Sequence, residues 1–150
     1  FYSLDGRYVI VFNGEIYNYV ELAREHGIPQ RTTGDTEVLV ELFAKHGVEC
    51  LNWLNGMFAF IILDTLTKEV FAARDRLGVR PLHLCVHDGR LWFASEVKAL
   101  FAAAPGIPRA LDPLGLAETF TFWTVVAPQT PFTGVTELQP GHVRPVSAGG

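Results

Sequence analysis

The 150-residue sequence predicts an α+β domain in which helices cover antiparallel sheets. Residues 57–63 form an apolar run of strand length, and residues 69–74 pair with it across the polar turn 64–68. Residues 81–86 and 91–94 flank Asp88-Gly89, a dipeptide that favours a tight hairpin turn. Helical patterns stand before and after these hairpins rather than between their strands. This order argues against a doubly wound parallel sheet.

The N-terminal part of the chain predicts a strand followed by a helix. Residues 7–12 are rich in β-branched and aromatic side chains, as a buried strand requires, and Asn13-Gly14 is expected to end that strand. Asn18 and Glu21 have the spacing of a capping box at the start of a helix. That helix is expected to bury Tyr19, Val20 and Ala23 and to end at Gly27.

A second helix is predicted to open at Gly34-Asp35-Thr36-Glu37 and to end at Gly47. Its apolar residues recur at helical spacing and predict a buried stripe made of Val38, Leu39, Leu42 and Phe43. Glu41 and Lys45 are four residues apart and are expected to form an exposed charged pair.

The second half of the chain predicts shorter helices and a peripheral end. Residues 50–54 indicate a short additional helix. Ser95 is expected to cap a helix over residues 96–103, and Asp112 a helix that begins with Pro113. Four prolines beyond Trp123 favour a peripheral or connecting segment over a core one.

Composition excludes several classes of protein. With 49% hydrophobic and 19% charged residues, the chain is not disordered. A net charge of -4 with scattered basic residues gives no face for nucleic acid. There is no run of membrane-span length and no signal peptide, so we expect a cytoplasmic protein without a membrane partner. Cys50 and Cys85 are expected to be core residues in a reducing compartment.

The heptapeptide Phe12-Asn13-Gly14-Glu15-Ile16-Tyr17-Asn18 is the strongest candidate for a functional motif. Asn-Gly alone usually marks a plain turn. At the end of a strand, however, the amide side chain of Asn13 and the backbone N–H of Gly14 are able to point at the same place, and glycine lets a ligand approach closely. Two converging donors would form an oxyanion hole.

This heptapeptide closely resembles a motif of the glutaminase domain of asparagine synthetases, which are class II glutamine amidotransferases. The resemblance is strong over residues 5–100 and weaker through residues 133–142. It implies the four-layer αββα sandwich of N-terminal-nucleophile hydrolases, here incomplete at its N-terminus. Residues 1–103 would be a partial glutaminase domain. Residues 104–150 would be its C-terminal part and the connection toward a synthetase domain that this sequence does not contain.

The resemblance also implies a binding site for L-glutamine. Asn13 and Gly14 would stabilise the oxyanion, and Glu15 would help hold the amino-acid end of the substrate. Gly34-Asp35-Thr36-Glu37 matches a family tetrapeptide whose aspartate binds the α-ammonium group, although the same carboxylate also suits the first turn of any helix. The family's arginine for the substrate carboxylate lies upstream of Phe1.

The catalytic nucleophile of the family is an N-terminal cysteine, whereas residue 1 here is phenylalanine. We therefore expect a fragment whose residues are those of a substrate-binding site but which does not hydrolyse glutamine on its own. Within the glutaminase domain no cofactor is expected. ATP and Mg²⁺ would serve the absent synthetase domain, where aspartate is activated and amidated, and a homodimer is left open.

Two further patterns are interpreted as structural. Residues 73–82 resemble the family's Ala-Arg-Asp-x-x-Gly-x-Lys-Pro-Leu, with Arg80 in place of lysine, and Gly78 is expected to have positive φ. His83, Cys85 and His87 alternate on one strand, but the CxxC spacings of structural zinc sites are absent and a metal site is not favoured.

Two alternatives to this function remain at the level of sequence. Phosphoribosyl and glucosamine-phosphate amidotransferases share Asn-Gly but typically precede it with histidine and lack Glu-Ile-Tyr-Asn, so Phe12 and residues 15–18 argue against them. A non-hydrolytic scaffold domain of an amide-forming enzyme, of the β-lactam synthetase type, keeps the fold without the cysteine.

Overall fold

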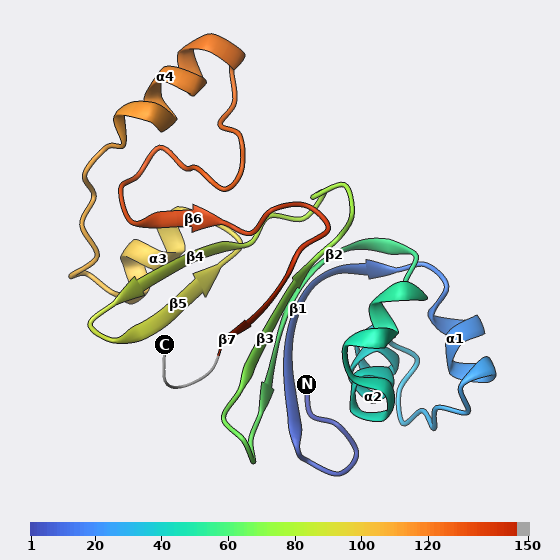
Figure 1. The fold of residues 1–150 in the computed structure, drawn as a ribbon. Coiled ribbons are helices and arrows are strands. Elements are labelled where there is room, and N and C mark those ends of the chain that lie inside the picture. Colours follow the sequence, from blue (N-terminus) through green and yellow to red (C-terminus); the bar gives the residue numbers. More distant parts are fainter. Residues whose placement is uncertain (147–150) are drawn as a thin grey trace.

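The computed structural model describes residues 1–146. Two antiparallel sheets pack face to face, with α1 and α2 outside the first sheet and α3 outside the second (Figure 1). In chain order the elements are β1 Tyr8–Ile16, α1 Tyr19–Glu25, α2 Asp35–His46, the 3₁₀ helix η1 Gly47–Asn52, β2 Gly56–Asp64, β3 Val70–Arg74, β4 His83–His87, β5 Arg90–Ala94, α3 Val97–Ala103, α4 Pro113–Phe122, β6 Val135–Glu137 and β7 Val143–Val146.

The two sheets have the strand orders β1-β2-β3-β7 and β5-β4-β6. Apolar side chains alternate along the strands, so each face of the first sheet has its own core. Ile10, Phe60 and Ile62 pack under α2, whereas Ala59 and Ile61 face the second sheet. A third core lies between the second sheet and α3. The predicted αββα sandwich is confirmed.

Most of the predicted elements are present. The β2–β3 and β4–β5 hairpins form as expected, and Asp88-Gly89 takes positive φ at both residues. Helix α2 begins after Gly34, ends at Gly47 and buries the predicted stripe. Asp112 caps α4 by accepting the N–H of Gly115 at 2.9 Å. Both cysteines are buried, as predicted for core residues.

The prediction that Asn13-Gly14 ends the first strand is wrong. Strand β1 continues to Ile16, paired in unbroken register with β2, so that Gly14 lies opposite Phe58. Gly14 has a φ of 153°, and a Cβ there would overlap the backbone carbonyl of Met57. Glycine therefore serves a close approach between two strands rather than a turn.

Two predicted helix caps are also wrong, because tertiary partners take the polar side chains. Asn18 occupies the N-cap position of α1 but bonds the carbonyl of Trp53 and the N–H of Asn55 instead of capping. Ser95 accepts from Asn13, and α3 begins after Glu96 without a side-chain cap.

The predicted side-chain exposure fails at two helical positions, Glu41 and Val20. Glu41 and Lys45 form no exposed pair, since Glu41 is buried and accepts the N–H of Leu4 at 2.6 Å, while Lys45 donates to the carbonyl of His26. In α1, Ala23 is buried but Val20 is exposed, and Leu22 takes the place of Val20 in the core.

The C-terminal segment is not peripheral, contrary to the prediction from its prolines. Strand β6 pairs with β4 in the second sheet, and β7 pairs with β3 in the first. Val135 and Leu138 are buried in two different cores. Residues 135–146 therefore belong to both sheets.

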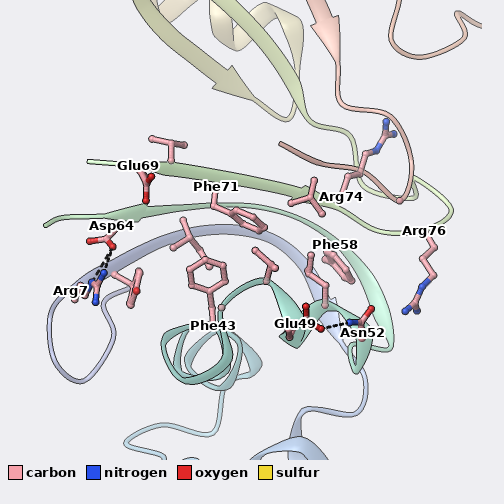
Figure 2. Close-up of a pocket in the computed structure, with 18 residues that line it drawn as sticks. Arg7, Phe43, Glu49, Asn52, Phe58, Asp64, Glu69, Phe71, Arg74 and Arg76 are labelled. Carbon is pink, nitrogen blue, oxygen red and sulfur yellow. Dashed lines mark hydrogen bonds and ion pairs between the residues drawn. The ribbon is translucent and has the colours of Figure 1, made fainter. Parts of the chain in front are cut away.

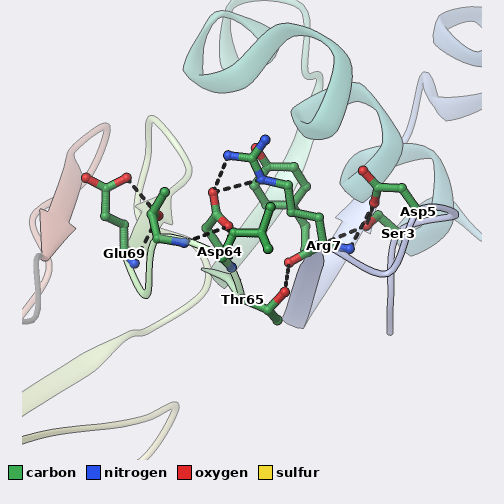
Figure 3. Close-up of polar contacts among 9 residues, drawn as sticks. Ser3, Asp5, Arg7, Asp64, Thr65 and Glu69 are labelled. Atoms are coloured by element: carbon green, nitrogen blue, oxygen red, sulfur yellow. Dashed lines mark hydrogen bonds and ion pairs between the residues drawn. The ribbon is translucent and has the colours of Figure 1, made fainter.

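A polar network fastens the end of β1 that lies farthest from the Asn-Gly motif (Figure 3). Two N–H groups of Arg7 donate to one carboxylate oxygen of Asp64, at 2.6 and 3.0 Å. This hydrogen-bonded pair holds the pKa of Asp64 well below its usual range. The hydroxyl of Thr65 donates to the backbone carbonyl of Arg7.

Within residues 1–146, no helix is long and apolar enough to cross a membrane.

Candidate active site

The backbone N–H of Gly14 points toward the free edge of the first sheet. Along a strand, the N–H groups of alternate residues point to the same side. The N–H of Ile10 donates away from β2, to the carbonyl of Phe1, and the N–H of Ile16 donates to Asp35. Gly14 lies between them in the same alternation, so its N–H faces that edge.

A cavity of about 280 Å³ opens at the end of β1. It is lined by Gly14, Glu15, Tyr19, Thr33, Gly34, Asp35 and Arg80. The structure thus brings together three of the four predicted site residues, which come from β1 and the start of α2. Asn13 does not line the cavity. Its side-chain amide donates to the hydroxyl of Ser95 at 3.0 Å, on the side of the second sheet.

Asp35 connects the strand that carries the motif to the second helix. One of its carboxylate oxygens accepts the N–H of Ile16 at 2.9 Å, and the other is 3.4 Å from the hydroxyl of Thr36. Its position in the first turn of α2 adds the favourable field of the helix N-terminus. The carboxylate keeps acceptor positions for a ligand, because each oxygen has two lone pairs.

The loop before Asp35 is held by the buried carboxylate of Glu37. Glu37 has no exposed surface and accepts four hydrogen bonds, from the backbone N–H and the Nε of Arg31 and from the backbone N–H and hydroxyl of Thr32. Burial would raise the pKa of this carboxyl, but the Arg31 and Thr32 donors outweigh it and lower the pKa to about 2. Glu37 therefore fixes Thr33 and Gly34 at the cavity wall.

Arg80 lines the cavity and was missed as a site residue by the sequence analysis. Its Nε atom is buried without a hydrogen-bond partner among the described residues. The signal in the sequence was the arginine that replaces the family's lysine in the segment 73–82. The rest of that segment has the structural role predicted for it, with Gly78 at a φ of 65°.

Asp75 organises the turn that presents Arg80. Its buried carboxylate accepts the N–H groups of Phe58, Leu77, Val79 and Arg80 at 3.0–3.1 Å. Burial would raise its pKa, but these four backbone donors outweigh that effect and lower it. Arg74 donates to three backbone carbonyls and forms an ion pair with Glu137 at 3.0 Å. The turn is thus fixed to both sheets.

A larger cavity of about 880 Å³ lies over β2 and β3, beside α2 and η1 (Figure 2). Phe43, Phe58 and Phe71 point into it, and the Arg7–Asp64 pair closes one end. None of the predicted site residues lines this cavity, whereas Gly14, Glu15 and Asp35 line the smaller one. We therefore place the chemistry at the smaller cavity.

The alternating residues of β4 have separate partners. His83 Nδ1 lies 3.2 Å from the carbonyl of Ser95, Cys85 is buried in a core, and His87 lies 3.4 Å from Asp88. In the described part of the chain, no group of three or more potential ligands is arranged to hold a metal ion.

Two solved structures illustrate the similarity of this fold to known enzymes. The glutamine phosphoribosylpyrophosphate amidotransferase from B. subtilis, in complex with ADP and GMP, gives a TM-score of 0.65 at 23% identity over 98% of this chain and 29% of that chain. A structure described as the allosteric regulatory enzyme of purine biosynthesis gives 0.63, also at 23% identity, over 93% of this chain and 26% of that chain. This chain therefore shares its fold with a part of these two enzymes.

Sequence similarity identifies the family to which this chain belongs. Residues 1–150 match the family described as "Glutamine amidotransferase domain", and the chain belongs to it. It is 38% identical to asparagine synthetase [glutamine-hydrolyzing] 3 of Bacillus subtilis, over 95% of this chain and 24% of that protein. A putative asparagine synthetase of Mycobacterium tuberculosis (strain H37Rv) is 40% identical over 90% of this chain and 22% of its own length.

A plant relative extends this group. Asparagine synthetase [glutamine-hydrolyzing] 3 of Arabidopsis thaliana is 46% identical over 66% of this chain and 18% of its own length. The resemblance to asparagine synthetase glutaminase domains is confirmed. The chain spans less than a quarter of the length of these relatives.

Proposed function

We propose that this chain is the glutamine-hydrolysing part of an asparagine synthetase, which releases ammonia from the side-chain amide of glutamine. The observation that carries the proposal is the cavity at the end of β1. Glu15, Asp35 and Arg80 surround it together with the backbone of Gly14. A free amino acid requires carboxylates around its ammonium group and a cation for its carboxylate, and this cavity offers both.

The charged side chains of the cavity bind different groups of the substrate. Asp35 binds the α-ammonium group of glutamine, and Glu15, the penultimate residue of β1, lines the same cavity. Arg80 lines the cavity and adds positive charge beside the α-carboxylate, which the family's arginine upstream of Phe1 binds, because a guanidinium suits planar carboxylates. Glutamine is thereby oriented with its side chain toward the strand edge that carries Gly14.

The oxyanion is stabilised by Gly14 and Asn13. When a thiolate attacks the side-chain amide, the carbonyl oxygen becomes negative and the backbone N–H of Gly14 faces it. The amide of Asn13 has two N–H groups, of which one donates to Ser95 outside the cavity, and we infer that the second donates to the oxyanion where the side chain of glutamine leaves the cavity. Loss of one such donor costs roughly 100- to 1000-fold in turnover.

The nucleophile of the proposed reaction is the N-terminal cysteine of the family, which these 150 residues do not include. Cys50 and Cys85 do not fit this role, since both are buried and neither lines the cavity. Burial raises the pKa of both thiols, that of Cys50 to about 12. The cysteine sulfur forms a thioester as ammonia leaves, and water then hydrolyses the thioester to glutamate.

The remaining parts of the proposal concern the whole protein. The relatives carry the name asparagine synthetase [glutamine-hydrolyzing], and this chain covers less than a quarter of them. We infer a synthetase domain in the same polypeptide, which uses ATP and Mg²⁺ to activate aspartate and receives the ammonia.

The test is an Asp35→Ala variant of the full-length protein. We expect KM for glutamine to rise by about tenfold or more, because a charge-assisted contact is lost, while ammonia-dependent synthesis stays intact. Glu25→Ala, on the exposed side of α1, is the matched control. Equal loss of both activities would assign Asp35 a folding role. Ammonia-dependent synthesis without any glutamine-dependent activity in the parent would instead identify a non-hydrolytic scaffold.

A further inference from the structure

Helix α4 carries a large apolar surface that the rest of the described chain leaves open. Phe120 is 82% exposed and Trp123, at the C-cap, is 92% exposed. Leu114 and Phe122 are also more than half exposed, and Gly115 is the only buried residue of the helix. The helix stands away from both sheets, on the side of α3 and β6 (Figure 1).

Helix α4 is attached to the domain at its first turn, where the N–H of Asp112 donates to the carbonyl of Pro131 at 2.9 Å. Gly115 lies so close to residues 130–131 that a Cβ would overlap the carbonyl of Thr130. This close approach fixes the position of the helix through its least bulky residue. The large side chains are thus held in place without being covered.

The segment that contains α4 is almost free of charge. Between residues 113 and 136, Glu118 is the only charged side chain, and it accepts the backbone N–H of Val126 at 2.9 Å. Depletion of charge with enrichment in aromatic residues is the composition of an interface core, whereas a solvated surface helix carries many charges.

The backbone of Trp123 gives a second, independent indication. Trp123 has a φ of 59° and a ψ of 16°, the left-handed conformation at which helices usually end in glycine. A bulky residue there costs of the order of 1 kcal/mol. Because the side chain is almost fully exposed, the described residues provide no contact that offsets this cost.

We propose that Phe120, Phe122 and Trp123 form the docking surface for an apolar face of the synthetase domain in the same polypeptide. The inference rests on the proposed function, which supplies that domain. The relatives are more than four times as long as this chain, so an intrachain partner of sufficient size is expected. Three aromatic residues exposed to this extent offer roughly 400–500 Å², a large share of one side of an interdomain interface.

Hydroxyl-radical footprinting of the full-length protein tests the surface residue by residue. We expect Trp123 and Phe120 to be oxidised about fivefold less than their exposure in this domain implies, because the core of an interface excludes water. Leu66, 73% exposed in the β2–β3 turn, is the internal reference. Full oxidation at Trp123 and Phe120 would overturn the proposal. Protection that disappears on dilution would also overturn it, since it would identify a second copy as the partner.

A Phe120→Ser/Trp123→Gly variant of the full-length protein provides the complementary test. Glycine suits the left-handed position, so the domain itself should fold at least as well. We expect several-fold faster proteolysis between the domains and an unchanged glutaminase kcat/KM, with Leu66→Ser as control. Unchanged protease resistance would refute the docking surface. Footprinting needs no glutamine, so a protected Trp123 in a protein without glutaminase activity would refute only the proposed function.

Discussion

The carboxylate of Glu37 allows a direct test of how the loop before the candidate site is held. Glu37→Gln keeps the shape of the side chain but removes its charge and replaces one acceptor oxygen by an NH₂ group. Arg31 and Thr32 together donate four hydrogen bonds to this carboxylate, which has no exposed surface. The substitution therefore leaves Arg31 without its counter-charge and turns a donor toward other donors.

The expected loss of stability follows from these contacts. Breaking a buried ion pair on one side costs about 3–5 kcal/mol, and hydrogen bonds to a charged group contribute about 1.5–3 kcal/mol each. Because Arg31 is half exposed and is able to regain water, we take the lower end, about 3 kcal/mol. For a domain of this size that corresponds to a decrease in Tm of roughly 6–12 °C.

Urea unfolding and amide hydrogen exchange measure this effect globally and locally. We expect a lower unfolding midpoint and loss of protection at the Thr32 N–H, together with a higher KM for glutamine. Glu21→Gln, on the exposed side of α1, is the control. The reasoning is refuted if Glu37→Gln unfolds within 1 kcal/mol of the parent, a difference about the size of one ordinary hydrogen bond.

The pH dependence of stability gives an independent check on Glu37. Its folded pKa of about 2 lies below the ordinary value of 4.5, so its contribution to stability is complete above pH 4.5. That contribution is lost as the pH falls from 4.5 toward 2, because the unfolded chain takes up the proton first. The Gln variant should lack this part of the acid-induced decrease.

Three further predictions concern other contacts. Gly14→Ala should lower the free energy of unfolding by about 3 kcal/mol or more, because its Cβ would overlap a backbone carbonyl of β2, whereas Gly6→Ala, where a Cβ meets open space, should cost about 1 kcal/mol. Urea titration measures the free energy of unfolding of both variants. The loss in Gly6→Ala gives the cost of positive φ alone, and the additional loss in Gly14→Ala gives the cost of the steric overlap. Asp75→Ala should cost about 3–5 kcal/mol, since four backbone N–H groups lose their acceptor, and a stability within 1 kcal/mol of the parent would contradict this. Cys50, with a pKa of about 12 and no exposure, should resist a thiol reagent at pH 8 in the folded chain and react on unfolding.

Local sequence patterns correctly predicted the elements whose conformation depends on neighbouring residues in the sequence. Asp88-Gly89 is a hairpin turn because both residues tolerate positive φ, and α2 buries the stripe that its spacing requires. Asn13-Gly14 carries the same kind of signal but lies within a strand. The residues that decide its conformation are on β2, more than 40 positions later. The local sequence around Asn13-Gly14 therefore does not predict this pairing.

The only residues of the candidate site that the sequence predicted are those that belong to a family motif. Gly14, Glu15 and Asp35 come from family motifs, and the fold brings them to one cavity. Arg80 was missed because it reaches the same cavity through a turn that Asp75 organises, more than 60 residues after the motif on β1. Sequence spacing gives no measure of that proximity.

The two last strands also have a consequence for synthesis on the ribosome. Cys85 pairs with Val135 and Ala73 pairs with Val143, so the second sheet is complete only after residue 137 has emerged and the first only after residue 146. A nascent chain paused before residue 135 presents β3 and β4 as bare edges. Bare edges of this kind are the sites at which unfinished copies on neighbouring ribosomes are able to pair, until β6 and β7 cover them.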